Sequence, residues 1–208
     1  MNPSRMRSAL AALAVLLLGC AGAAGAQDAQ RDPRSIKRIA IDSAVTQPEI
    51  PLIQSPGNFK AFMIAGGIGA AIDQQDAGKA FREYMRKNNI DISKIVFESF
   101  KRVIEEDKTF ALGADADTKL KLAINSYGFG ASGFMGGSER RPLINITASL
   151  VSSTGNVVWK KTDYITNLSK LTQVYTYEQL AENPQLIIKS FDQASVLVSR
   201  QILAGLKQ

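Results

Sequence analysis

The sequence contains no histidine and a single cysteine, Cys20. Histidine is the commonest general base and the commonest metal ligand in proteins, so its absence removes the usual form of both chemistries. One cysteine cannot form a disulfide within the chain, nor a zinc site built on several thiolates. The sequence therefore predicts a protein that uses no cofactor and no metal.

Long hydrophobic runs and concentrated charge are also lacking. The apolar run at residues 9–19 would reach only about 16 Å as a helix, roughly half of a bilayer's hydrocarbon core. The net charge of +6 comes from scattered Lys and Arg residues, with no basic stripe and no interleaved aromatic residues. Nucleic acid is therefore not an expected partner. With 208 residues, of which 45% are hydrophobic, the chain suffices for one domain with a core.

The start of the chain has the order positive, apolar, small, which is typical of a secretory signal. Two arginines precede the apolar run, and Leu17-Leu18-Gly19-Cys20 closes it. This stretch resembles the lipobox of bacterial lipoproteins, in which a small residue precedes the cysteine. The resemblance implies that the Cys20 thiol receives a diacylglyceryl group, that the signal at 1–19 is removed, and that the new amino group is acylated.

An acylated cysteine predicts where in the cell the protein is located. Each buried methylene contributes roughly 0.8 kcal/mol, so several chains hold a protein on a bilayer almost irreversibly. By the same resemblance, Ala21 after the cysteine implies the outer membrane of a Gram-negative-type envelope, facing the periplasm. Residues 20–35 then form a flexible tether with a reach of about 20 Å. The alternative is ordinary signal cleavage after Ala26, which discards Cys20 but still exports the protein.

The rest of the chain, 36–208, is expected to be a single periplasmic domain. Alternating apolar residues predict strands at 36–42, 119–125, 143–152 and 157–166. A Ser-Thr-Gly-Asn turn joins the last two, so they form a hairpin, and Trp159 is expected to cover one end of the core.

Three helices complete the pattern. The second half of 59–89 has apolar residues at helical spacing, and a stronger helix begins at its N-cap Asp91. The pair Asn183-Pro184 starts a final helix that runs to about Leu206. The expected fold class is α+β, in the order β-α-α-β-β-β-α. A small mixed or antiparallel sheet of about four strands carries the helices on one face.

Motifs for catalysis fail on inspection. The outline of a phosphate loop has Asp73 in place of its first glycine and Ala80 in place of its serine or threonine. Ser132 has no histidine to activate it. Asp115 and Asp117 are too few oxygen ligands for a divalent ion and are expected to form a solvated turn. We therefore expect no catalytic residue, although carboxylates brought together by folding leave an enzyme as an alternative.

Two glycine-rich apolar segments, 61–72 and 127–137, stand out instead. Neither alternates as a membrane barrel strand does, and the first is too short to span a bilayer as a helix. Glycine lets backbones approach closely, so these segments are candidates for a contact with a protein partner or with further copies of the chain. The alternatives are a flexible hairpin tip with a buried helix entry, and insertion of these segments into the membrane. The candidate contact residues are Gly66, Gly67, Gly69, Phe129 and Phe134.

The order of elements and the Gly-Asn-Val-Val-Trp hairpin resemble the small envelope lipoproteins with an anticodon-binding-like α/β fold. Curli-secretion channel subunits, polysaccharide-export subunits and peptidoglycan-synthase activators are of this kind. The resemblance spans roughly residues 36–206 and implies a tethered, non-catalytic binding or assembly module. A subunit of an oligomeric outer-membrane export pore is the alternative.

Overall fold

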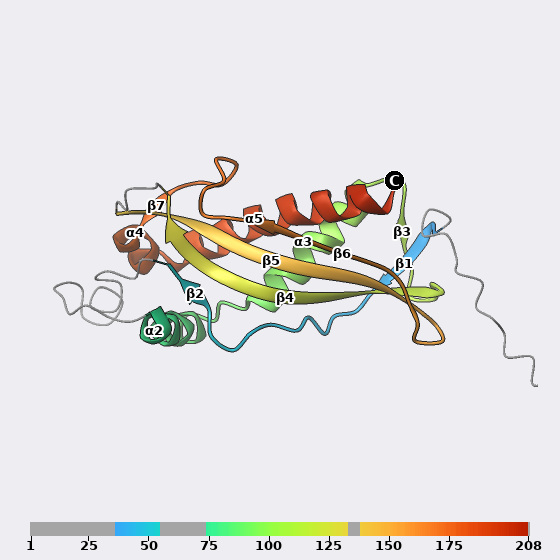
Figure 1. Ribbon diagram of the computed structural model, residues 1–208, viewed down its shortest axis with the longest axis horizontal. Coiled ribbons are helices and arrows are strands. Elements are labelled where there is room, and N and C mark those ends of the chain that lie inside the picture. The colour runs from blue at the N-terminus through green and yellow to red at the C-terminus, as the bar shows by residue number, and fades with distance from the viewer. Residues whose placement is uncertain (1–35, 55–73, 133–137, 208) are drawn as a thin grey trace, which may run out of the picture.

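The computed structural model describes residues 36–54, 74–132 and 138–207. Its centre is an antiparallel pair of long strands, β4 (Thr118–Ala131) and β5 (Glu139–Ser152). β6 (Val157–Ile165) pairs antiparallel with β5, and β1 (Arg38–Ile41) runs parallel to β4 on the other side. The sheet is curled, with helices packed against it (Figure 1). The predicted α+β class is confirmed.

The expectation of about four strands is wrong, because the sheet contains seven. The additional strands have two residues each: β2 (Leu52–Ile53) pairs with β4, β3 (Ala111–Leu112) with β1, and β7 (Tyr175–Thr176) with β5. Two residues are too few to show an alternating pattern, so the sequence gives no signal for them. The observed order of elements differs from the expected one by these three strands and one short helix.

β4 is longer than predicted because an irregularity hides its second half. The alternation that ends at Ile124 resumes at Tyr127 and Phe129, since a register shift at Asn125 turns the strand by one residue. All three apolar side chains therefore face the helices and are buried. The Asn125 side chain lies on the opposite, open face, where its Nδ2 donates to Oδ1 of Asn145 at 2.7 Å.

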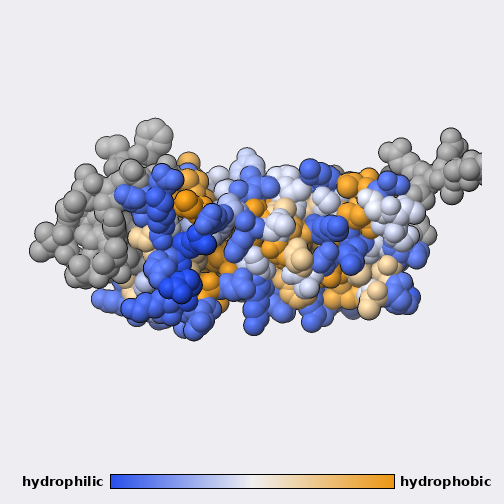
Figure 2. Space-filling view, turned by 90° about the horizontal axis from the view of Figure 1, so that it is seen from below, coloured by the Kyte–Doolittle hydropathy of each residue, from blue (hydrophilic) through white to orange (hydrophobic). Residues whose placement is uncertain are grey.

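The structure describes four helices, and three of them start at caps that the sequence contains. They are α2 (Gln74–Lys87), α3 (Ile92–Glu106), α4 (Tyr177–Glu182) and α5 (Pro184–Leu206). Asp91 accepts from the Lys94 backbone at the start of α3, and Asn183 does the same for Gln185 in α5. Thr176 closes a capping box at α4. Seen from below in Figure 2, hydrophilic residues gather at the end of the molecule where α2 lies.

The core lies between the sheet and these helices, with aromatic rings joining three elements. Phe129 of β4 makes edge-on contacts with Phe81 of α2 and Phe191 of α5, at centroid distances of 5.7 and 5.2 Å. All three side chains are buried, at 0–1% exposure. Edge-to-face rings at these distances contribute about 0.5–1.5 kcal/mol each beyond the burial of their area. α2 and α5 therefore pack on the same face of β4. The predicted β5–β6 hairpin is confirmed, and Trp159 packs partly buried against this core.

Candidate functional site

Most residues singled out in the sequence lie outside the described residues. These are the lipidation candidate and its lipobox, with the glycines of the first segment and one phenylalanine of the second: Cys20, Leu17, Leu18, Gly19, Gly66, Gly67, Gly69 and Phe134. Phe129 is described, and the structure corrects its assignment. Its side chain is wholly buried between two rings of the core, so it is not available to a partner.

Glycines in the described part of the second segment serve close approach within the chain. A Cβ on Gly128 would lie 1.7 Å from the carbonyl oxygen of Leu52, so only glycine lets β2 pair here with β4. A Cβ on Gly130 would lie 2.7 Å from both Gln54 Oε1 and Asn167 Cγ. Three segments distant in sequence therefore meet at this end of β4: β4 itself, the residue after β2, and the loop that contains Asn167.

The third of these segments, the β6–β7 loop (residues 166–174), is the candidate functional site. It leaves the sheet after β6 and returns to the same edge of β5 as β7. Leu168 and Leu171 are 59% and 60% exposed, and Tyr164, close before the loop, is 58% exposed. Within the described residues, these are three of the four large hydrophobic side chains that are strongly exposed. Their concentration in eight residues makes this segment a candidate for a contact surface.

Arg141 of β5 holds the loop from the sheet side. Its Nη1 donates to the carbonyl oxygens of Ser169 and Thr172, at 2.5 and 2.9 Å. Pro142, which has no amide proton, lies beside it in the gap that β6 and β7 leave along β5. A charged donor satisfies two loop carbonyls that would otherwise need water, so the loop has a defined shape.

Two further contacts fix the loop to β4 and α5. Asn167 Nδ2 donates to the carbonyl oxygen of Ala131 at 2.6 Å. On the helix side, Gln193 Nε2 donates to the Leu171 carbonyl at 3.1 Å, and its Oε1 accepts from the Gln173 backbone at 3.2 Å. The loop is thus pinned to three elements while its leucines point to solvent. Sequence reasoning missed this site, although the Arg-Arg-Pro run at 140–142 was a signal for it.

Beside the loop, Arg140 and Tyr177 form a buried pair that rigidifies the end of β5. The Arg140 guanidinium lies 4.4 Å from the centroid of the Tyr177 ring, and both residues are 7% exposed. Burial raises the pKa of Tyr177, and the neighbouring Arg140 opposes that rise only in part. Tyr177 is therefore neutral at physiological pH and serves as a platform for the cation.

Two further features were sought among the described residues: a cluster of metal ligands and a helix that could span a membrane. Among residues 36–54, 74–132 and 138–207, no cluster of three or more His, Cys, Asp or Glu side chains is arranged to hold a metal ion. Asp115 instead forms an exposed ion pair with Arg38 at 2.7 Å. None of the helices described is both long and apolar enough to cross a membrane.

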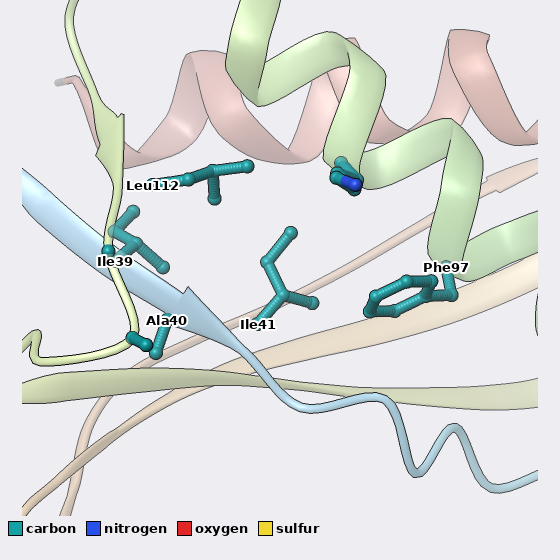
Figure 3. Close-up of a pocket in the computed structure, with 8 residues that line it drawn as sticks. Ile39, Ala40, Ile41, Phe97 and Leu112 are labelled. Atoms are coloured by element: carbon teal, nitrogen blue, oxygen red, sulfur yellow. The ribbon is translucent and has the colours of Figure 1, made fainter.

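A small cavity opens at the opposite end of the sheet, between α3 and the strands β1 and β3; we call it the α3–β1 pocket. Ile39, Ile41, Leu112 and Phe97 surround it, as Figure 3 shows. Its volume is about 210 Å³, and among the described residues that line it Lys101 of α3 is the one with a charge.

Comparisons with solved structures find many chains with a distantly similar fold. No family model matches the chain, and no curated protein matches it. The chain is similar to the DUF330 protein XCC0632 from Xanthomonas campestris, with 14% identity, 83% and 85% of the two chains covered and a TM-score of 0.46. It is also similar to a minor lipoprotein from Acinetobacter baumannii (15% identity, 81% and 92% covered, TM-score 0.38). A third is the PelC dodecamer from Paraburkholderia phytofirmans (13% identity, 80% and 89% covered, TM-score 0.30). Identities and TM-scores this low do not transfer a function.

Proposed function

We propose that the chain is a lipid-anchored envelope lipoprotein whose folded body is a non-catalytic binding module. Cys20 holds it at the outer membrane, facing the periplasm, and the β6–β7 loop is the surface that contacts a protein partner. The observation that supports this contact surface is the loop itself: two leucines about 60% exposed on a backbone pinned to three elements. An apolar surface held in a fixed shape costs solubility and suits recognition.

The position of the loop relative to the tether agrees with this role. The described chain begins at Ile36, just before β1, and β1 pairs with the first residues of β4. The loop contacts Ala131 at the last residue of β4. Fourteen residues of strand separate the two ends by roughly 40 Å. Figure 1 shows β1 and β7 at opposite ends of the long axis. A body anchored through its start therefore presents the loop away from the bilayer.

The exposed area of the two leucines gives an estimate of the binding free energy that this contact can contribute. Complete burial of a leucine side chain contributes about 1.5–3 kcal/mol, so covering the exposed part of Leu168 or Leu171 contributes roughly 1–2 kcal/mol. Two such side chains offset only part of the free energy that association costs in lost translational and rotational freedom. A stable complex must therefore include further surface around the loop.

The anchor is tested by the Cys20→Ser variant. We expect the wild-type chain to sediment with the outer-membrane fraction and the variant to be released into the soluble periplasmic fraction, because the hydroxyl cannot accept the diacylglyceryl group. Mass spectrometry of the mature amino terminus gives the direct readout. An acylated Cys20 supports the proposal, whereas a chain that starts at Gln27 shows ordinary signal cleavage after Ala26.

The contact surface is tested by placing a photo-crosslinking amino acid at position 168 in cells. The matched control is position 157, because Val157 is also 59% exposed but lies in β6 near the other end of the sheet. We expect one discrete crosslinked species from 168 and none from 157. Adding Leu171→Asp should remove that species. Equal crosslinking at both positions would show that the loop is not the contact.

The same experiment addresses the alternative of an export-pore subunit. A crosslink between two copies of the chain, together with one large discrete species in size-exclusion chromatography in detergent, would identify a ring-forming subunit. A crosslink to a different protein supports the binding module.

A further inference from the structure

The α3–β1 pocket combines an apolar lining with one cation, Lys101, that has no partner among the described residues. Ile39, one of the lining residues, is wholly buried, while Ile41, Phe97 and Leu112 are only half-buried. Half-exposed apolar side chains around a cavity lose dispersion contacts that an apolar ligand would restore. The pocket therefore favours hydrocarbon over water.

Lys101 supplies the polar end of this site. It is half-buried on α3, and no ion pair or hydrogen bond to it is found in the part of the chain that the structure describes. Glu98 and Glu105 lie one turn away on the same helix but do not pair with it. By contrast, Arg38 of the neighbouring strand is already neutralised by Asp115 at 2.7 Å. The pocket thus presents one ammonium group beside hydrocarbon, which is complementary to an anionic group on an aliphatic chain.

We propose that the α3–β1 pocket binds a fatty acid, with the carboxylate at Lys101 and the first part of the chain between Ile39, Ile41, Phe97 and Leu112. The pocket is about 210 Å³, and an apolar cavity of about 150 Å³ holds benzene in another protein, so about eight carbons fit here. A longer chain would project from the opening.

The place of the pocket in the chain supports a lipid occupant over a peptide. β1 lines it and begins two residues after Ile36, where the tether joins the folded body. Fifteen residues separate Ile36 from Cys20, so under the proposed function this end of the body stays within roughly 20 Å of the bilayer. A fatty acid partitions into that bilayer and is available there. This last step alone rests on the proposed function.

The test uses octanoate below its micelle threshold, added to the exported Cys20→Ser chain, with methyl and amide NMR as the readout. We expect saturable shifts at Ile39, Ile41 and Leu112. Affinity should rise from butanoate to octanoate and level off for longer chains. Each methylene that enters the pocket should tighten binding by up to about fourfold, from 0.8 kcal/mol per buried methylene.

Three variants and one ligand control separate specific binding from partitioning. In the Cys20→Ser chain, Lys101→Ala should weaken octanoate binding about fivefold, the upper range for a partly exposed charge pair. Octanol should bind the Cys20→Ser chain with Lys101 intact as weakly. Lys94→Ala removes the lysine two turns earlier on α3 and should bind like wild type. Leu112→Trp fills the pocket from an edge strand and should abolish the shifts.

The proposal is overturned if octanoate gives no saturable shifts in the Cys20→Ser chain. It is equally overturned if octanol and octanoate bind alike, or if Lys101→Ala and Lys94→Ala bind alike. Because these measurements use a chain in solution, they do not depend on whether Cys20 carries lipid. Failure of the pocket and failure of the anchor are therefore distinguishable.

Discussion

Replacing Arg141 by alanine should release the β6–β7 loop while leaving the core intact. The substitution removes two hydrogen bonds from a charged donor, those to the Ser169 and Thr172 carbonyls. Hydrogen bonds to charged groups contribute about 1.5–3 kcal/mol each. Arg141 is only half-buried and water can reach the freed carbonyls, so we expect about 2 kcal/mol for the two together. A loss of that size opens the loop about thirtyfold more often.

Hydrogen exchange measures this opening directly. In the Arg141→Ala variant, amides of residues 166–174 should exchange about thirtyfold faster, while those of the central strands β4 and β5 keep their protection. Arg141→Lys should give an intermediate rate, because an ammonium retains the charge but not the planar geometry. Arg86→Ala is the control, since Arg86 pairs on the surface of α2 with Glu83 and should change nothing measurable. If the loop keeps its protection without Arg141, or if β5 loses protection equally, Arg141 does not act as the loop's local support.

Three other outcomes follow from the fold. Phe191→Ala should lower the free energy of unfolding by about 3–5 kcal/mol in chemical denaturation, because the ring is wholly buried against two others. Gly128→Ala should lower it by about 1–3 kcal/mol, since the new Cβ must displace the backbone of β2; a neutral result would refute that close approach. At Asp107, burial raises the carboxyl pKa, but donors from Lys207 and Thr109 outweigh it and the net pKa is lowered. The stabilisation is therefore present above the unfolded pKa of about 3.9 and is lost as pH falls through the lower folded value. The difference in stability between wild type and Asp107→Asn should accordingly vanish at low pH.

Local signals account for the long elements. Asp91 and Asn183 cap helices at the residues the sequence indicates, because a capping side chain acts on backbone amides two or three residues away. Alternation placed the centre of β5 and the hairpin to β6 for a similar reason, since side-chain period reports which face is buried. These features depend on neighbours in the chain and are therefore readable from it.

Features that depend on distant neighbours were not readable. The pairing of β2 with β4 exists because Gly128 admits a carbonyl from Leu52, 76 residues earlier in the numbering. Likewise Arg141 acts on a loop about thirty residues later. In both pairs, the sequence around one residue contains no pattern that indicates its distant partner. Phe129 shows the opposite error: glycines around it suggested an exposed contact, whereas those glycines let the chain pack closely above a buried ring.

The length of α5 has a practical consequence for handling the protein. This helix of 23 residues starts beside the β6–β7 loop and returns the chain to the other end of the sheet, as Figure 1 shows. There Lys207 reaches Asp107, and Ala111 a few residues later bonds to Lys37 at the start of the body. A reporter or affinity tag attached directly after Lys207 would therefore start at the end of the body where β1 lies. A label at Lys207 lies at the opposite end of the sheet from Leu168 and Leu171 and leaves both side chains unobstructed.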